Sequence, residues 1–171
     1  VERDAHKGMI IGTGGERLTH PVVRVAVTPT GAGYWLVTSD GAIHRFGDGQ
    51  DFESLTGLGF CAPKPVVSIG ASRTGQGYWL LQNDGAVRTF GDAQFYGSTG
   101  NLHLNSPVIG MQATPSGKGY WLVAGDGGIF SYGDAQFLGS TGSLRLNSPV
   151  SGMQATPYGH GQWLYAQDGG I

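Results

Sequence analysis

The sequence predicts an all-β protein, a four-bladed β-propeller of repeats of about 42 residues that is closed by pairing of its N- and C-terminal strands. Three observations support this. The tetrapeptide Gly-Tyr-Trp-Leu occurs three times and once more as Gly-Gln-Trp-Leu, an Asp-Gly pair follows each copy, and no stretch free of Gly and Pro exceeds seven residues. Because a globular helix usually needs ~8–20 residues, such a chain favours short strands.

The repeat is defined by tryptophans that are 44, 42 and 42 residues apart, and a Pro-Val pair and an apolar run precede each of them. This period is the size of a propeller blade, whereas a solenoid coil of three strands is usually shorter and ranks second. The predicted units are residues 15–57, 58–100, 101–142, and 143–171 together with 1–14.

The second unit shows the strands expected in each blade. Pro65 to Ser72 is an apolar run, Gly77 to Gln82 alternates aromatic and aliphatic residues, and Asp84-Gly85 is a favoured hairpin turn. Ala86 to Phe90 returns as a third strand, and Ala93 to Tyr96 is expected to form a short fourth one.

The two ends of the chain predict how the ring closes. The C-terminus stops where a third strand has just begun, and residues 1–14 match the part of a unit that follows it. The ends are therefore expected to share one blade in a monomer, which hides sheet edges that would otherwise invite aggregation. The alternative is an open fragment that another copy completes, giving a larger toroidal homo-oligomer.

Composition and charge limit the classes of partner that the chain can bind. Among 171 residues, 39% are hydrophobic, enough for one core, so we predict a single domain over residues 1–171. Twelve acidic against ten basic side chains leave a formal charge of −2, with no basic excess for a nucleic-acid backbone. No run approaches the ~20 apolar residues of a membrane span. The single cysteine, Cys61, allows no internal disulfide.

One stretch carries a family resemblance: GYWLVAGDGGIFSYGDAQFLGSTG at 119–142, followed by LNSPV at 146–150. It resembles the Gly-rich repeats of secreted and cell-envelope proteins of actinobacteria. The resemblance covers nearly the whole chain, and departs at Gly49, Asp51 and Glu53 and in residues 1–11. It implies a propeller-like fold, an extracellular or cell-envelope location and a non-catalytic accessory role, and it brings no set of catalytic residues.

When the repeat units are aligned, each set of equivalent positions forms a column. The residues that recur in a column favour a structural role over a catalytic or binding role. The tryptophans are expected in the core rather than as sugar platforms, because buried aromatic side chains dominate packing energetics. By strand alternation, Tyr34, Tyr78 and Tyr120 face the opposite way and should pack between blades with satisfied hydroxyls. Two aspartate columns fit turns, where the side chain bonds its own backbone; they are Asp40, Asp84, Asp126 and Asp168, and Asp48, Asp92 and Asp134.

No catalytic or metal motif stands out, so we expect neither an enzyme nor a cofactor. The five histidines fall in different columns of the repeat. Asp48, Asp51 and Glu53 come closest to a calcium loop but lack its density of acidic ligands. A hydrolase site around His44 and these three carboxylates is the alternative function.

The first strands of the blades should line a central channel. Aligned, they place Arg24, Ser68, Gly110 and Gly152 in one column, and Ala26, Gly70, Gln112 and Gln154 in another. Small residues in these columns are expected to let the strands crowd together rather than to bind a ligand.

The favoured function is a non-catalytic extracellular module that binds a glycan, a cell-envelope polymer or a protein through variable loops. The candidate ligand-binding residues are Asn101, His103, Asn105, Arg145 and Tyr158. A purely structural spacer is the third hypothesis.

Overall fold

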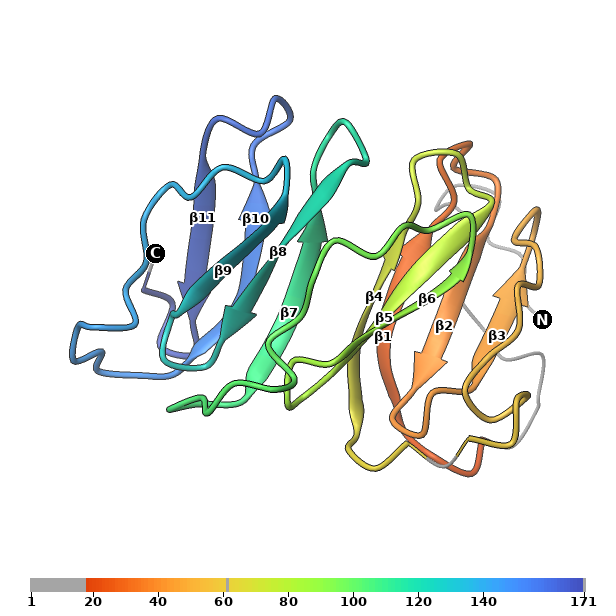
Figure 1. Cartoon of the computed structure of the whole chain (residues 1–171), viewed down its shortest axis with the longest axis horizontal. Helices are drawn as coiled ribbons and strands as arrows, with labels where there is room; N and C mark the ends of the chain where they lie inside the picture. Colours follow the sequence, from red (N-terminus) through yellow and green to blue (C-terminus); the bar gives the residue numbers. More distant parts are fainter. Residues whose placement is uncertain (1–17, 61, 171) are drawn as a thin grey trace.

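The structure, a computed structural model, describes residues 18–60 and 62–170, and within them it contains four antiparallel β-sheets and no α-helix. We number the sheets 1 to 4 in chain order. They follow one another along a row from the N-terminal to the C-terminal end (Figure 1). Each sheet holds one of the four tryptophans. This confirms the all-β prediction and the repeat.

The strands occupy the same three positions in each repeat. The first strand begins at a valine that follows a proline: β1 (Val22–Val27), β4 (Val66–Ala71), β7 (Val108–Ala113) and β10 (Val150–Ala155). The second carries the tryptophan: β2 (Tyr34–Thr38), β5 (Gly77–Gln82), β8 (Gly119–Ala124) and β11 (Gln162–Ala166). The third follows the Asp-Gly turn in sheets 1 to 3: β3 (Ile43–Phe46), β6 (Val87–Gly91) and β9 (Ile129–Gly133).

A bulge near the start of every first strand sets which side chains reach the core. In β4 the register shifts between Val66 and Ser68. Residues three apart on a regular strand face opposite sides. The extra residue instead places Val66 and Ile69 in one cluster. The same shift occurs at the corresponding place in β1, β7 and β10.

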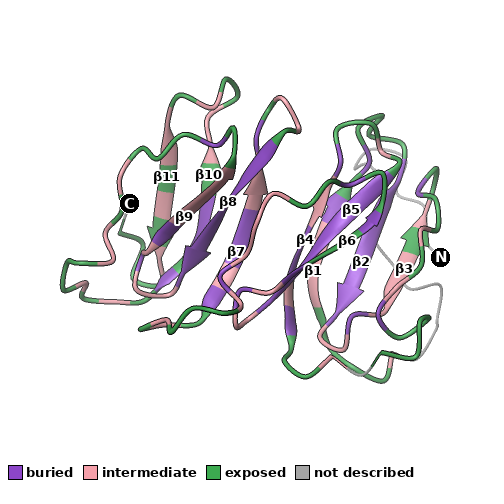
Figure 2. Ribbon diagram, in the orientation of Figure 1, coloured by how far each residue is buried: buried purple, intermediate pink, exposed green. Residues whose placement is uncertain are grey.

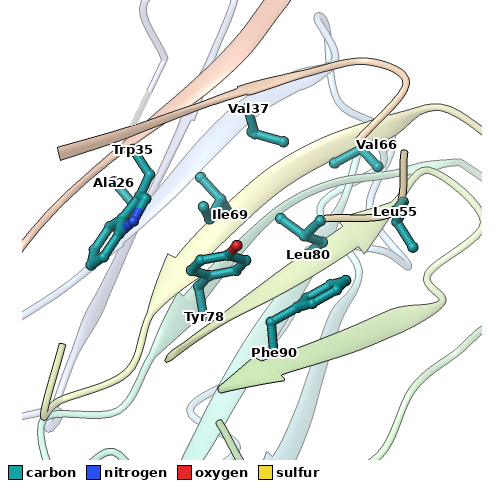
Figure 3. Packing of buried hydrophobic residues seen from close by; sticks show 9 residues of the cluster. All are labelled: Ala26, Trp35, Val37, Leu55, Val66, Ile69, Tyr78, Leu80 and Phe90. Carbon is teal, nitrogen blue, oxygen red and sulfur yellow. The ribbon is translucent and has the colours of Figure 1, made fainter. Parts of the chain in front are cut away.

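The core lies between neighbouring sheets rather than inside any one of them. Trp35 and Val37 on one face of sheet 1 pack against Tyr78 and Leu80 on the facing side of sheet 2 (Figure 3). The rings of Trp35 and Tyr78 have centroids 5.8 Å apart. The next junctions repeat this arrangement, so sheets 2 and 3 have both faces covered by neighbours.

Backbone hydrogen bonds also join the sheets, and they recur in register. At each junction the N–H of the first residue of the first strand donates to a carbonyl just after the second strand of the preceding sheet. These bonds are Val66 to Ser39 at 2.8 Å, Val108 to Asn83 at 2.9 Å, and Val150 to Gly125 at 2.9 Å.

The predicted fourth strand at Ala93–Tyr96 does not form. Side chains occupy the backbone groups that a ladder would use. The amides of Tyr96 and Gly97 donate to the Tyr120 hydroxyl at 3.2 and 3.1 Å, and the Gln94 carbonyl accepts the Trp79 indole N–H at 2.7 Å. The segment is an irregular connection that seals the junction, and the described residues give each sheet three strands or fewer.

The prediction that all four tryptophans lie in the core is wrong for Trp163. This side chain is 59% exposed, whereas the other three tryptophans are 0 to 2% exposed. Figure 2 shows the difference, with β2, β5 and β8 buried along their length and β11 alternating between intermediate and exposed residues. The physical reason is that no described segment covers the outer face of sheet 4.

The predicted closure between the chain ends involves residues 1–17, which lie outside the described residues, as does Cys61. Among the described strands, the first strand of each sheet contacts the first strand of the next, but β1 and β10 do not contact each other. The described sheets therefore form an open row (Figure 1).

Candidate functional site

A hollow of about 680 Å³ lies between the loop that follows sheet 1 and the β6 side of sheet 2. The loop that follows sheet 1 supplies Leu58 and Phe60, and β6 supplies Arg88, whose guanidinium lies 5.6 Å from the centre of the Phe60 ring. Phe95 and Asn101, which follow β6, also line it. Both phenylalanine rings are more than half exposed. We call this hollow groove A.

A second hollow of about 480 Å³ occupies the same place between sheets 2 and 3, and we call it groove B. It is lined by residues one repeat further along, so Phe137 stands where groove A has Phe95, and Phe130 where it has Arg88. His103 and Asn105 line groove B and also a smaller neighbouring hollow of about 310 Å³. The two grooves thus present related but different surfaces.

The Asp-Gly turns give the grooves their shape. Asp84 accepts a hydrogen bond from the Ala86 amide at 3.0 Å, and Gly85 adopts a φ of +84°. The Gly85 carbonyl then accepts the amide of Thr99 at 3.1 Å, which fixes the loop leading to Asn101. The same aspartate bond is made by Asp40, Asp126 and Asp168, which confirms the predicted turn role of this column.

Three of the five predicted ligand-binding residues, Asn101, His103 and Asn105, lie on the loop between β6 and β7. Asn101 lines groove A, whereas His103 and Asn105 line groove B. Arg145 lies on the corresponding loop one repeat later, before β10, and lines neither groove. Tyr158 lies at the other end of β10, in the hairpin loop before β11, beside a separate hollow of about 290 Å³. The five residues therefore do not form one site.

The aromatic walls of the grooves were missed by reasoning from the sequence. The sequence assigned Phe95 to a fourth strand, and an irregular connection instead exposes its ring. A signal for it exists, because Phe137 repeats it one unit later beside the same Gly-Asp-Ala-Gln residues. A repeated phenylalanine in a segment that does not form a strand marks a surface that recurs between units.

The residues of the alternative hydrolase site have structural partners. Asp48 accepts hydrogen bonds from Thr30 and from Thr28, the latter at 2.8 Å, and these bonds hold its pKa below the ordinary value. Asp51 accepts the amide of Glu53 at 3.0 Å. His44 lies in β3 opposite Leu36. Among residues 18–60 and 62–170, no three His, Cys, Asp or Glu side chains are placed to hold a metal ion.

The aspartates that end the third strands form a second structural column. They hold the loop between the first and second strands. In sheet 1, Asp48 accepts bonds from Thr28 and Thr30 of this loop, and Thr28 also accepts the amide of Gly33 at its end. In sheets 2 and 3, Asp92 accepts a bond from Thr74, and Asp134 accepts bonds from Thr114 and Ser116. The turn role predicted for this column thus extends to a clamp between two loops.

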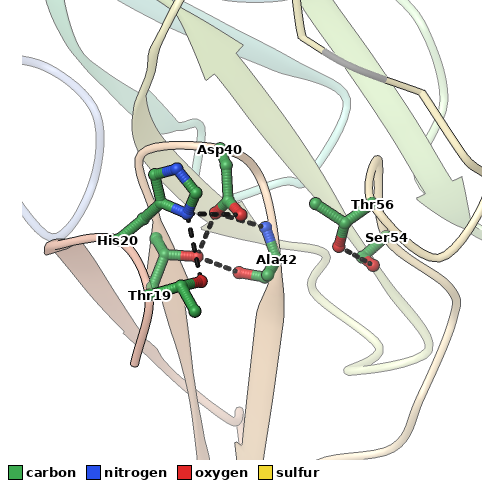
Figure 4. A network of polar contacts seen from close by, with 7 residues as sticks. Thr19, His20, Asp40, Ala42, Ser54 and Thr56 are labelled. Atoms are coloured by element: carbon green, nitrogen blue, oxygen red, sulfur yellow. Dashed lines mark hydrogen bonds and ion pairs between the residues drawn. The ribbon is translucent and has the colours of Figure 1, made fainter. Parts of the chain in front are cut away.

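Sheet 1 has one further polar network, at its Asp-Gly turn (Figure 4). Asp40 accepts a bond from Thr38 at 2.5 Å, and its other oxygen lies 3.0 Å from Nδ1 of His20. Partial burial alone would raise the pKa of Asp40, but the bonds from Thr38 and the Ala42 amide, together with His20, hold that pKa below its ordinary value. The network fixes the turn at the start of the row.

The predicted channel column brings the first strands together across sheets. Ser68 is fully buried in β4, and a Cβ placed on Gly110 in β7 would lie 3.3 Å from the Arg24 guanidinium, which reaches there from β1. A larger side chain at 110 would displace that guanidinium. This agrees with the expectation that small residues let the strands crowd together.

The described residues include no helix long and apolar enough to cross a membrane. The sequence matches no protein-family model and has no significant similarity to a curated protein.

Proposed function

We propose that the chain is a non-catalytic binding module that takes a carbohydrate polymer in grooves A and B. The observation that supports this most is the recurrence of one open groove at two successive junctions, each with an exposed phenylalanine beside amide and hydroxyl groups. Ligand sites are generally concave and largely apolar, with a few polar groups that fix orientation. Both grooves have this composition.

The chemistry of the walls favours a sugar over a charged ligand. An exposed phenyl face suits the apolar C–H face of a pyranose ring, and amides and carboxylates suit its hydroxyl groups. Groove A contains Phe60 and Phe95 for the first role and Asn101 and Asp84 for the second. Its one cation, Arg88, lies over the Phe60 ring, and Asp84 balances its charge. A polyanion therefore has little to attract it.

The repetition of the groove favours a polymer over a single sugar. Two binding sites on one rigid support convert the second binding event into an intramolecular one, which raises avidity without new contacts. The clamps at Asp92 and Asp134 and the backbone bonds between sheets fix the spacing of the two grooves. A polysaccharide with repeating units can occupy both at once.

We also infer that the four sheets are propeller-type blades of an extracellular or cell-envelope protein. Support for the blades comes from the face-to-face stacking of the sheets and the contacts between successive first strands. Support for the location comes only from the resemblance of the repeat to actinobacterial secreted proteins. Visualising an epitope-tagged full-length protein in fractionated cells tests the location.

The experiment for binding compares alanine variants on a panel of bacterial cell-wall polysaccharides and a glycan array. We expect Phe95→Ala and Phe137→Ala each to weaken binding at least tenfold, and the double variant to abolish it. Leu144→Ala, which removes another exposed apolar side chain outside both grooves, is the matched control. Unchanged binding by the double variant would exclude the groove proposal.

The five residues selected from the sequence are tested in the same assay. We expect alanine at Asn101, His103 and Asn105 to weaken binding, and alanine at Arg145 and Tyr158 to leave it unchanged. Loss of binding in the last two variants alone would move the site to the loops of sheet 4.

A further inference from the structure

The outer face of sheet 4 is an incomplete junction. Trp163 and Tyr165 in β11 are 59% and 39% exposed, and Ser151 beside them in β10 is exposed too. In sheets 1 to 3 the residues at the Trp163 and Tyr165 positions are buried by the next sheet. The side chains that form a core elsewhere in the row here form a surface.

The three complete junctions show what covers such a face. The first strand of one sheet packs against the first and second strands of the sheet before it. It contributes a valine and, three residues later, an isoleucine or methionine, as Val108 and Met111 do on the face of Trp79. An occupant of the sheet 4 face therefore needs a first strand with the same pattern. At the first two of these junctions, a tyrosine and a leucine of the next second strand, such as Tyr120 and Leu122, complete the cluster.

The chain carries such a strand at the other end of its row. Val22 and Val25 of β1 are in the positions of Val108 and Met111. Val22 is 40% exposed, although its counterparts in the other three sheets are at most 4% exposed, and Val25 is only half-buried. Tyr34 and Leu36 in the adjacent strand are already buried, so the surface that sheet 1 offers is β1 itself.

Backbone hydrogen-bonding groups at the two ends of the row are also complementary. At each complete junction, the carbonyl at the position of Gln167 accepts the N–H at the position of Val22. Among the described residues, the Gln167 carbonyl receives no backbone N–H, and Val22 has no carbonyl of a preceding sheet to bond. The two ends of the row thus carry the two halves of one hydrogen bond.

We propose that the face of β10 and β11 binds β1 of a second copy of this chain, head to tail, with Trp163 at the centre of the contact. This interface is separate from grooves A and B and does not depend on their ligand. Its two sides differ, so association continues until a ring closes or a filament forms. Buried tryptophan is among the residues that contribute most to such contacts.

The test uses one variant for each side of the interface. Trp163→Ser removes the centre of the sheet 4 face, and Val22→Glu places a charge on β1; both positions are exposed, and circular dichroism verifies that the variants fold. Sedimentation velocity is measured over a concentration series for the wild type, each variant and an equimolar mixture of the two. Leu144→Ser is the control for loss of an exposed apolar side chain.

We expect the wild type and Leu144→Ser to self-associate as concentration rises, and each face variant to associate at least tenfold more weakly. The mixture should form a dimer and nothing larger, because the sheet 4 face of Val22→Glu can still bind β1 of Trp163→Ser. A monomeric wild type at every concentration would overturn the proposal, and protection of its Trp163 from acrylamide would then indicate closure within one chain. Self-association of Val22→Glu alone would also overturn it, because it indicates pairing of two sheet 4 faces.

Discussion

The side-chain amide of Gln162 donates a hydrogen bond to the carbonyl of Gly139 at 3.1 Å, across the junction between sheets 3 and 4. At the junction before it, Tyr120 makes the same bond from its hydroxyl to Gly97, at 2.6 Å. Glutamine thus keeps the hydrogen bond but loses the ring that packs edge-on against a tryptophan elsewhere. Its Oε1 atom is also buried without a partner.

Restoring tyrosine at this position should stabilise the protein. We expect Gln162→Tyr to raise the free energy of unfolding by about 1–2 kcal/mol, since it removes an unsatisfied buried acceptor and adds an aromatic contact with Trp121. Urea unfolding followed by circular dichroism measures the change. Gln162→Leu, which keeps the bulk but loses the bond to Gly139, should be less stable than the wild type. A Gln162→Tyr protein no more stable than the wild type would contradict this account of the junction.

The glycines of the Asp-Gly turns allow a clean separation of backbone strain from packing. Gly85 and Gly169 have nearly the same φ, +84° and +81°, but a Cβ at Gly85 would overlap the hydroxyl of Thr99, whereas nothing lies within 4 Å of one at Gly169. We expect Gly169→Ala to cost ~1–2 kcal/mol, the left-handed backbone term alone. Gly85→Ala should cost ~1–3 kcal/mol more.

A second substitution tests the packing part of that difference. The Thr99 hydroxyl is buried without a hydrogen-bond partner, so Thr99→Ala loses no bond. In the double variant with Gly85→Ala it should recover part of the excess cost, as coupled neighbours do. Thermal unfolding of the wild type, the two single variants and the double variant gives the coupling free energy between positions 85 and 99. Equal costs for Gly85→Ala and Gly169→Ala would show that packing at this turn is not tight.

The elements predicted best from the sequence are those whose causes are local. Gly77–Gln82 was predicted as a strand from alternation and is β5, and Asp84-Gly85 was predicted as a turn and forms one. The hydroxyls of Tyr78 and Tyr120 were expected to be satisfied, and they bond the carbonyls of Glu53 and Gly97. Alternation and turn chemistry act over a few residues, and the repeat shows them several times.

The features that were missed depend on contacts between units. Ala93–Tyr96 reads as a strand, but its backbone bonds go to side chains of the next sheet. Trp163 matches the other tryptophans in sequence, yet its exposure depends on whether another unit packs on its face. Phe95 lines a groove only because the connection is irregular. A pattern within one repeat does not contain this information.

The clamp at Asp48 should be visible in an acid titration. Hydrogen bonds from Thr30 and Thr28 lower the pKa of this carboxyl, so we expect Thr30→Val to raise it towards the ordinary value. Nuclear magnetic resonance of the carboxyl carbon measures the shift. Thr74→Val, the corresponding change in sheet 2, should leave the titration of Asp48 unchanged and is the matched control.

The same bonds set the sign of the effect on stability. A carboxyl with a lowered folded-state pKa binds fewer protons in the folded chain than in the unfolded one, so its contribution is present above about pH 4 and is lost as the pH falls further. The difference in stability between wild type and Thr30→Val should therefore shrink in acid. A difference that stays constant down to pH 2 would exclude the charged form of Asp48 as the origin of the stabilisation.

Because of its buried tyrosines, we expect the protein to lose stability at alkaline pH as well. Burial raises the pKa of Tyr78, Tyr120 and Tyr132, and the charge of Asp51 raises that of Tyr78 further. Above about pH 10 the unfolded chain loses these protons while the folded chain keeps them, so the free energy of unfolding must fall as the pH rises.

Tyr78→Phe removes one such proton and should flatten this decline. It also loses the bond to the Glu53 carbonyl, so it should be less stable than the wild type at pH 7. Urea unfolding from pH 7 to 11 separates the two effects, because the lost bond shifts the whole curve and the lost titration changes its slope. Parallel curves for wild type and Tyr78→Phe would show that the Tyr78 hydroxyl titrates alike in the folded and unfolded chains, in conflict with its burial against Trp35.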